Sequence, residues 1–352
     1  MRIARTDCEV VLNFLRERNL VVRDLSFLRF GESVIVPVAR QPSGDEVEGL
    51  ASLGIAYEGT EADFPARENR PNNMLGYLGG KLPPQLLVRI PKSYDIVGDI
   101  AILELQEELK GHGALIGKAA MEVHGGLRLV LNKTSDISGK FRVGGYEVIA
   151  GHGPTETIHR EHGCLYRLDP TKVFFTPRLS TERARVASQV TEGEVVGDLF
   201  AGVGPFSILI AKRVAGVKVY SVDVNPLAFQ YLEGNIRLNK LGDKVIAILG
   251  DAAEVASGTL KGICSRTIMN LPAGAELFLE AASNALLPEG GVVHLHIFVD
   301  GLESLRIRVA AIEDKIRKIG WKEVTASRTR VIREVGVRSY HVAVDISLSQ
   351  RE

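Results

Sequence analysis

A short apolar stretch that ends in an acidic residue and two glycines constrains this chain more than any other feature. Val195–Asp198 is typical of a buried strand, and Gly202 and Gly204 follow it in a loop that ends at Pro205. Glycine permits a tight turn with close backbone approach, and proline suits the first turn of a helix. The stretch therefore predicts a strand, a glycine loop and a helix, which is the nucleotide-side entry of a doubly wound α/β domain.

The C-terminal half continues this pattern as a regular alternation. We expect strands at 194–198, 217–223, 245–249, 267–270, 292–298, 321–335 and 340–347, and helices at 180–191, 205–214, 226–239, 275–286 and 302–319. Five strands that alternate with helices, followed by a closing strand pair, resemble the seven-stranded, Rossmann-like, doubly wound fold of class I methyltransferases. We therefore predict an α/β catalytic domain of this class at 169–352, preceded by two smaller α+β domains.

The first of these smaller domains is expected at 1–62. Asp7 is placed to cap a helix, and 33–38 is typical of a strand. The apolar face of that helix is expected to consist of Val10, Val11, Leu12 and Leu15.

The segment 61–73 is polar, bears prolines and lacks apolar periodicity, and on this basis 63–80 is interpreted as a flexible linker. The second small domain, at 81–168, is interpreted as an RNA-binding α+β unit. Within it we expect a helix at 107–124 and strands at 86–90, 96–105, 127–131 and 141–149.

Composition narrows the possible partners and compartments. The 43 basic and 43 acidic residues give no net charge, so a nucleic-acid partner has to be met by a local basic surface, and coating of DNA is disfavoured. Cys8, Cys164 and Cys264 match no zinc motif, which indicates reduced thiols. No apolar run is long enough to span a membrane, and no signal-like core begins the sequence. We expect a cytoplasmic protein that binds neither membrane nor DNA.

Acidic residues at the ends of three successive strands indicate which nucleotide the glycine loop binds. The Asp198 carboxylate would repel a pyrophosphate but attract the amino group or sulfonium of S-adenosylmethionine. Asp223 is placed to bind both ribose hydroxyls, and Asp251 to accept a hydrogen bond from the adenine amine. The alternatives are that both residues only cap helices, or that the ligand is a nicotinamide cofactor. The predicted adenosylmethionine site comprises Asp198, Phe200, Gly202, Gly204, Asp223, Val224, Asp251, Ala252 and Asn270.

The fourth strand ends in Asn270-Leu271-Pro272, a position that abuts the cofactor in a doubly wound fold. The Asn270 amide both donates and accepts, which suits the edge of a nucleobase. The stretch is similar to the Asn-Pro-Pro-aromatic motif of enzymes that methylate exocyclic amines, although Leu271 and Ala273 depart from it. The alternative is an asparagine that caps a turn before Pro272.

A block at 173–183, just before the glycine loop, combines aromatic, basic and acidic side chains. Val173–Thr176 is strand-like, and Ser180 or Thr181 is placed to cap the helix that follows. Glu182 then stabilises the first helical turn and pairs with Arg178 or Arg183. Alternatively, these groups hold a flat base on which Phe174 or Phe175 stacks.

Together these blocks resemble the archaeal and eukaryotic tRNA (guanine-37-N1)-methyltransferase family. The blocks that carry the resemblance occur in order at Ser93–Asp99, Phe174–Arg183, Asp198–Phe206, Asp223–Pro226 and Asn270–Pro272. The likeness covers roughly 80–350, and the first domain resembles the mobile N-terminal domain of that family more weakly. It implies methyl transfer from S-adenosylmethionine to N1 of guanine 37 in tRNA, by a monomer that needs no metal.

The resemblance also implies a role for individual residues. Glu182 would be the general base that removes the N1 proton, and Arg142 would donate to O6 as negative charge develops there. Asn270 would hold the base edge, and Arg178 would help to order the site. Phe174, Arg183 and Pro272 would contact the base. His159 and Cys164, in a run that superficially suggests metal ligands, are expected to be structural.

Rival functions remain open within the resemblance. The nearest is transfer of the aminocarboxypropyl group of the same cofactor onto a tricyclic base in tRNA, and some relatives methylate a tricyclic intermediate. An rRNA methyltransferase and a non-enzymatic tRNA-binding protein are the other classes. A cluster near the C-terminus is interpreted either as a phosphate-binding surface or as a solvated sheet face: Arg328, Arg330, Arg333 and Arg338.

Overall fold

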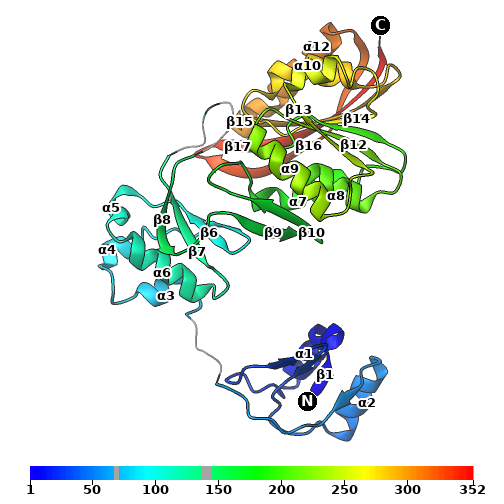
Figure 1. Ribbon diagram of the computed structural model, residues 1–352. Helices are drawn as coiled ribbons and strands as arrows, with labels where there is room; N and C mark the ends of the chain where they lie inside the picture. The colour runs from blue at the N-terminus through cyan, green and yellow to red at the C-terminus, as the bar shows by residue number, and fades with distance from the viewer. Residues whose placement is uncertain (67–70, 136–138, 140–143, 352) are drawn as a thin grey trace. The chain divides into compact units, whose positions relative to one another are not determined.

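A seven-stranded sheet organises the C-terminal half of the chain (Figure 1). The structure is a computed structural model that describes residues 1–66, 71–135, 139 and 144–351. The strand order is β13-β12-β11-β14-β15-β17-β16, and β17 runs antiparallel to both of its neighbours. The strands are β11 (Val195–Asp198), β12 (Lys218–Asp223), β13 (Val245–Leu249), β14 (Arg266–Met269), β15 (Gly290–Asp300), β16 (Trp321–Gly336) and β17 (Ser339–Arg351). The predicted doubly wound α/β fold with a closing strand pair is confirmed.

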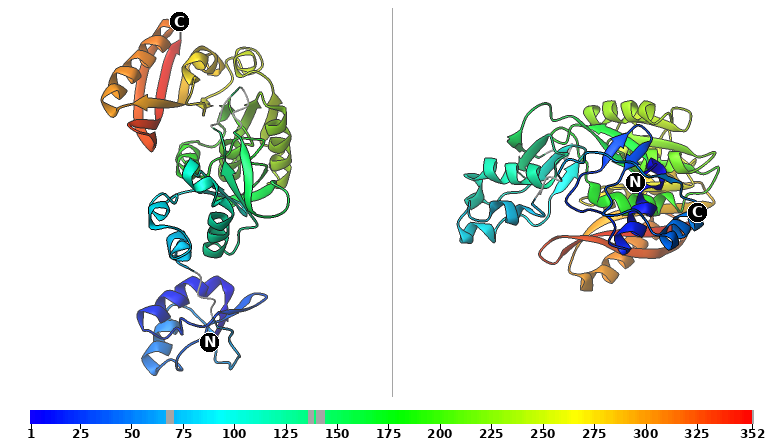
Figure 2. Two further views of the ribbon diagram at one scale, coloured as in Figure 1. Left: turned by 90° about the vertical axis from the view of Figure 1, so that its left-hand side faces the viewer. Right: turned by 90° about the horizontal axis from the view of Figure 1, so that it is seen from below.

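Helices cover both faces of this sheet because its central strands are apolar on both sides. One core contains side chains of α7, α8 and α9, and the other contains side chains of α10, α11 and α12. The helices are α7 (Ser180–Ala187), α8 (Pro205–Arg213), α9 (Pro226–Leu238), α10 (Ala252–Ser257), α11 (Leu279–Ala285) and α12 (Leu305–Lys318), with 3-10 turns η2 (Pro177–Leu179), η3 (Ala275–Phe278) and η4 (Leu302–Ser304). In Figure 2, α12 and the hairpin β16–β17 lie together at one edge of the domain.

A four-stranded sheet with strand order β5-β6-β7-β8 precedes this domain. Its strands are β5 (Asp95–Val97), β6 (Ile100–Leu103), β7 (Leu129–Lys133) and β8 (Tyr146–Gly151), and its helices are α3 (Met74–Leu78), α4 (Pro84–Leu87), α5 (Glu107–Lys110) and α6 (Gly113–Val123). The strand predicted at 86–90 is wrong, because Pro83 and Pro84 begin a helical turn there. The strand predicted at 96–105 is two strands, since Gly98 turns the chain at a φ of +59°.

A hairpin that the sequence did not reveal links the two sheets along the chain. Strands β9 (Thr157–Glu161) and β10 (Cys164–Leu168) pair antiparallel around His162 and Gly163, whose φ angles are +49° and +77°. Two consecutive positive φ angles indicate a two-residue hairpin turn, which histidine adopts less often than asparagine. By contrast, the strand-like stretch predicted at Val173–Thr176 is not a strand, and it runs into η2.

The N-terminal unit, Met1–Asn72, is compact by itself, and Asn73–Glu352 forms the other unit. It contains η1 (Arg5–Asp7), α1 (Cys8–Glu17), α2 (Gly44–Ser52) and a sheet of β1 (Arg2–Ala4), β2 (Leu28–Phe30), β3 (Ser33–Ile35) and β4 (Tyr57–Glu58). The Asp7 side chain makes no capping bond to α1 and accepts a hydrogen bond from the Thr6 hydroxyl instead. Val10, which we expected on the apolar face of this helix, is 49% exposed. Phe14, which we did not predict there, is buried in the core. The finer boundaries at 62, 80 and 168 remain predictions.

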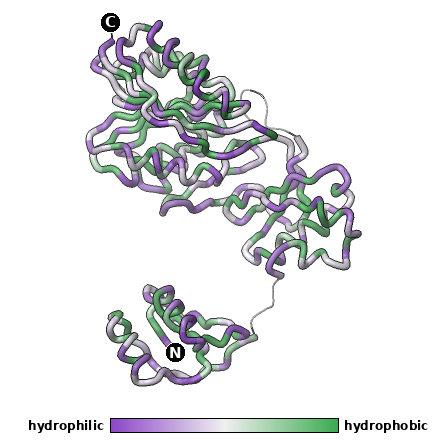
Figure 3. The backbone as a smooth tube through the Cα atoms, turned by 180° about the vertical axis from the view of Figure 1, so that it is seen from behind, coloured by the Kyte–Doolittle hydropathy of each residue, from purple (hydrophilic) through white to green (hydrophobic). Residues whose placement is uncertain are grey.

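Apolar and polar segments alternate in short runs along the chain (Figure 3). This alternation suits many short elements that each bury one side against a neighbour. No helix in the described part of the chain is both long and apolar enough to cross a bilayer.

Candidate functional site

A cavity of about 810 Å³ opens where the parallel strands of the large sheet end. Strand β11 lies between β12 and β14 in the sheet, so the chain connections diverge there, and ligands of doubly wound folds bind at such a point. The loops after β11, β12, β13 and β14 supply lining residues 199–202, 223–225, 250–252 and 270–273. Other walls come from the segment before α7 and from the closing strands, through Phe174, Phe175, Thr176, Leu179, Arg183, Phe298, Arg333 and His341.

The glycine loop adopts a conformation that other residues would strain. Gly202 and Gly204 have φ angles of +56° and +90°, and a Cβ on Gly204 would lie 2.5 Å from Leu232. Gly202 lines the cavity. Gly204, also predicted for the cofactor site, does not line it and is the N-cap residue of α8. The loop thus brings backbone close to any ligand in the cavity.

Asp223 and Asp251 both line the cavity and both also hold backbone, so capping and ligand binding are compatible. The Asp223 carboxylate accepts hydrogen bonds from the backbone N–H of Gly202, at 2.7 Å, and of Asn225, at 2.9 Å. Burial raises the pKa of Asp223 despite these bonds. Asp251 caps α10 by accepting from Ala253 N at 2.8 Å. The neighbouring Phe200, Val224 and Ala252, also predicted for this site, line the cavity.

Asp198 lies beneath the glycine loop and does not line the cavity. Its Oδ2 accepts a hydrogen bond from the Ser207 hydroxyl at 2.7 Å, and Ser221 donates to Ser207 in turn. Its Oδ1 is buried and has no hydrogen-bond partner in the described chain. Burial raises the pKa of Asp198 to about 7. We expected this carboxylate to face the ligand. In the structure it instead points into the domain, where Ser207 and Ser221 hold it.

Asn270 and Pro272 line the wall that continues β14. Both are half-buried, and the Asn270 amide makes no hydrogen bond with the residues that the structure describes. An amide with free donors and an acceptor on a cavity wall is suited to the edge of a polar planar ligand. The geometry therefore gives Asn270 access to a ligand, beyond a turn-capping position alone.

Arg183 lines the cavity but is occupied in holding the wall together. Its guanidinium, 1% exposed, donates to both oxygens of Glu161 at 2.7 and 2.5 Å and to the Thr176 carbonyl at 3.1 Å. Burial raises the pKa of Glu161, but the hydrogen bonds and charges of Arg183 and His159 together outweigh it and lower the pKa to about 2. Phe174, predicted to contact the base, lines the cavity beside this pair.

Arg178 is not among the residues that line the cavity. Its Nε donates to Asp95 at 2.5 Å, in the Ser93–Asp99 block that carried part of the resemblance. The Thr176 hydroxyl accepts from Arg178 N and so caps η2, whereas neither Ser180 nor Thr181 caps α7. Arg178 thus ties the four-stranded sheet to the segment before α7. Arg142 lies outside the described residues.

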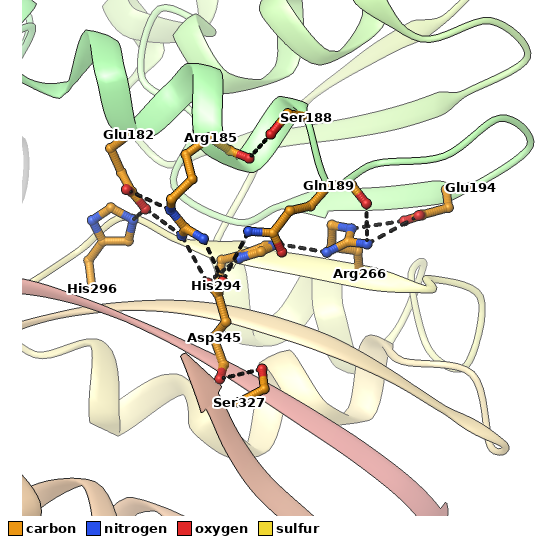
Figure 4. A network of polar contacts seen from close by, with 10 residues as sticks. All are labelled: Glu182, Arg185, Ser188, Gln189, Glu194, Arg266, His294, His296, Ser327 and Asp345. Carbon is orange, nitrogen blue, oxygen red and sulfur yellow. Dashed lines mark hydrogen bonds and ion pairs between the residues drawn. The ribbon is translucent and has the colours of Figure 1, made fainter. Parts of the chain in front are cut away.

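Glu182 is 2% exposed and belongs to a buried polar network (Figure 4). Its two oxygens accept from Arg185 at 2.6 and 2.9 Å, so its partner is neither Arg178 nor Arg183. Arg185 continues to Asp345 at 2.5 and 2.9 Å, and Asp345 contacts His294 Nδ1 at 2.6 Å. Glu182 does not line the cavity.

Two further histidines lie between Glu182 and the cavity. His296 Nε2 is 3.8 Å from Glu182 Oε1, and His296 Nδ1 is 3.0 Å from Nε2 of His341, which lines the cavity. Sequence reasoning missed both histidines, together with Arg185 and Asp345. The available signal was a pair of histidines, at 294 and 296, within an otherwise apolar buried strand.

The C-terminal arginines do not share one environment. Arg328 and Arg330 are exposed on β16, whereas Arg338 pairs with Glu303. Arg333 lines the cavity, and burial lowers its pKa. One member of the cluster predicted to meet phosphates therefore places positive charge at the cavity itself.

Known families match nearly the whole C-terminal unit. The TRM5/TYW2 methyltransferase domain matches 157–324, and the TYW2 N-terminal domain matches 74–155. Trm5b of Pyrococcus abyssi, named a tRNA (guanine(37)-N(1))-methyltransferase, is 39% identical over 99% of this chain and 98% of its own. This chain belongs to the TRM5/TYW2 methyltransferase family. The resemblance noted from the sequence is thereby confirmed.

Solved structures of this family agree with the fold. The crystal structure of Pyrococcus abyssi Trm5b matches with a TM-score of 0.72 over 99% of this chain and 98% of that one. A complex of aTrm5 with tRNALeu matches at 30% identity, with a TM-score of 0.71 and 99% coverage of both chains. A Methanocaldococcus jannaschii tRNA(Phe) (4-demethylwyosine(37)-C(7)) aminocarboxypropyltransferase is 35% identical over 62% of this chain and 85% of its own. The family therefore includes members named for different transferred groups.

Proposed function

We propose that this protein transfers a methyl group from S-adenosylmethionine to N1 of the guanine at position 37 of tRNA. The observation that carries the proposal is full-length similarity, at 39% identity, to a protein named for this reaction. The Asn270–Pro272 wall of the cavity supports it, because this is where a target base would meet a cofactor bound at the strand ends. The protein is further proposed to act as a monomer in the cytoplasm.

The residues of the cavity fit adenosylmethionine. Asp223 offers carboxylate oxygens for the ribose hydroxyls, and Asp251, with Ala252 beside it, offers an acceptor for the adenine amine. Gly202 lets the backbone approach the ligand. Asp198, buried below, leaves one oxygen unpartnered in the described chain, and its ionised form would contribute negative potential beneath a cationic ligand. When bound, adenosylmethionine supplies a methyl group activated by a sulfonium.

The target base would lie against Asn270, Pro272 and Phe174. The Asn270 amide would hydrogen-bond the base edge, and Phe174 would stack on the flat face, as aromatic side chains do on extruded bases. Arg183, locked by Glu161, would keep this wall rigid. Following the resemblance, Arg142 would donate to O6, and Arg178 would order the segment through Asp95.

Guanine N1 carries a proton and is a poor nucleophile until that proton leaves. We assign its uptake to Glu182, as the general base, because a buried carboxylate ends the polar path that leads from the cavity wall. Arg185 holds the carboxylate with both oxygens engaged, which fixes its orientation.

A second candidate function is transfer of the aminocarboxypropyl group, or methylation of a tricyclic wyosine intermediate, at the same tRNA position. The similarity to an aminocarboxypropyltransferase supports aminocarboxypropyl transfer as the second candidate. It spans 62% of this chain, whereas the guanine methyltransferase relative spans 99%, and this difference favours methyl transfer to guanine.

Mass analysis of the modified nucleoside separates these functions. Purified protein is incubated with adenosylmethionine and unmodified tRNA transcript, and the tRNA is digested to nucleosides. We expect a gain of one methyl group on guanosine. A gain of the whole aminocarboxypropyl chain, or methylation only of tRNA that carries a tricyclic base, would replace the proposal with the corresponding alternative.

A further inference from the structure

Two buried histidines lie between the cavity and Glu182, with one hydrogen bond between their rings and a gap of 3.8 Å from the second ring to the carboxylate. His341, 3% exposed, belongs to the cavity wall, and its Nε2 lies 3.0 Å from Nδ1 of His296. The opposite nitrogen of His296 lies 3.8 Å from Oε1 of Glu182. A carboxylate that does not line the cavity is thus joined to it by two imidazole rings.

The position of the His296 ring is unfavourable for the stability of the fold. His296 is fully buried, and its Nε2 has no hydrogen-bond partner among the described residues. A buried polar atom without a partner destabilises the folded state. A movement of about 1 Å would bring this nitrogen within hydrogen-bond distance of Glu182. The unpartnered Nε2 of His296 thus faces the gap to Glu182, whereas Nδ1 of the same ring is within hydrogen-bond distance of His341.

We propose that His341 and His296 form a proton relay that carries the N1 proton of the target guanine from the cavity to Glu182. The proposal rests on the proposed function and adds the route by which the base is reached. His341 is the catalytic group in contact with substrate, and His296 transmits the proton. Glu182 is its terminal acceptor.

Each transfer in the relay balances. The N1 proton moves to Nδ1 of His341, whose Nε2 proton moves to Nδ1 of His296. The Nε2 proton of His296 then moves to Oε1 of Glu182. N1 keeps its electron pair and forms the bond to the methyl carbon, while the bond from sulfur to that carbon breaks and its pair remains on sulfur. Reverse transfers return the proton to solvent once product has left.

The surroundings of His296 suit a relay better than a site that holds charge. Burial, with the positive charge of Arg185 and the neighbouring His294, lowers the pKa of His296 to about 3, and Asp345 opposes this only in part. The ring is therefore neutral at physiological pH. A concerted transfer, in which each ring gives up one proton as it receives another, never requires a stable imidazolium there.

His296→Gln tests the relay, because glutamine retains hydrogen bonding but does not pass a proton as imidazole does. We expect kcat to fall about 100-fold, with the KM values for tRNA and adenosylmethionine unchanged. We also expect the residual rate to rise about tenfold per pH unit, since only guanine already deprotonated in solution would react. His341→Gln should give the same pH profile and serves if the first variant does not fold.

His294→Gln is the matched control. His294 lies on the same strand and is equally buried, but its nitrogens contact Asp345 and Arg266 rather than the line to the cavity. We expect His294→Gln to lower thermal stability, because it disrupts a buried polar contact, and to leave the pH profile of the rate like that of the unmodified protein. If His296→Gln and His341→Gln both keep that profile, with kcat within about twofold, the relay is wrong.

A proton inventory on the unmodified protein tests the relay without any substitution. Single-turnover rates in mixtures of H₂O and D₂O should depend on deuterium fraction along a curve, because several protons move together. A linear dependence would mean a single transfer directly to the base and would overturn the relay. Either result presupposes that guanosine is methylated. Failure of methylation itself would instead refute the proposed function.

Discussion

Glu182→Gln is expected to lower kcat for tRNA methylation by about 10²–10⁴-fold, the range that general-base catalysis contributes. Glutamine keeps the size of the side chain and can still bond Arg185, but it cannot take up a proton. The affinities for adenosylmethionine and tRNA should remain unchanged, since Glu182 does not line the cavity. Single-turnover kinetics with saturating tRNA measure the chemical step directly.

Glu194→Gln is the matched control for this substitution. Glu194 is a largely buried carboxylate in the same region, and it pairs with Arg266 as Glu182 pairs with Arg185. Its loss should reduce stability through an unpaired arginine but change kcat little. If both substitutions reduce kcat equally, Glu182 acts through structure, and the assignment of the base fails.

Asp223→Ala is expected to weaken adenosylmethionine binding about 100-fold. Two charge-assisted hydrogen bonds from Asp223 to the ribose hydroxyls would contribute about 1.5 kcal/mol each, and about 3 kcal/mol corresponds to roughly two powers of ten in Kd. The substitution also frees the N–H groups of Gly202 and Asn225, which Asp223 holds. Isothermal titration calorimetry with adenosylmethionine measures the change.

Glu254→Gln provides the comparison, because this exposed carboxylate lies in the first turn of α10 and does not line the cavity. Its Kd should match that of the unmodified protein. A Kd for Asp223→Ala within about threefold of that value would remove Asp223 from the cofactor site.

The sequence predicted features that depend on local pattern. The apolar run before Asp198, the two glycines and Pro205 specify strand, loop and helix with little tertiary context, and that fold is confirmed. Asp223, Asp251 and Asn270 could be located because parallel strands bring their carboxyl ends to one edge. These predictions needed only strand order.

Side-chain partners far apart in sequence were not predictable in this way. Glu182 pairs with Arg185 only three residues away, but the geometry of that pair depends on Asp345, more than 150 residues later. The line from His341 through His296 exists because β15 and β17 are neighbours in a particular register. Asp198 turned inward for a similar reason, since Ser221 lies on the adjacent strand and supports Ser207. Pairing register, rather than local propensity, sets these contacts.

The central claim is that guanine at position 37 is the group that receives the methyl. Its most direct test uses two tRNA transcripts that differ only at position 37, one with guanosine and one with adenosine, incubated with the protein and adenosylmethionine. Nucleoside mass spectrometry should detect N1-methylguanosine in the first transcript and no methylated nucleoside in the second. Equal methylation of both transcripts, or methylation at another position, would contradict the account.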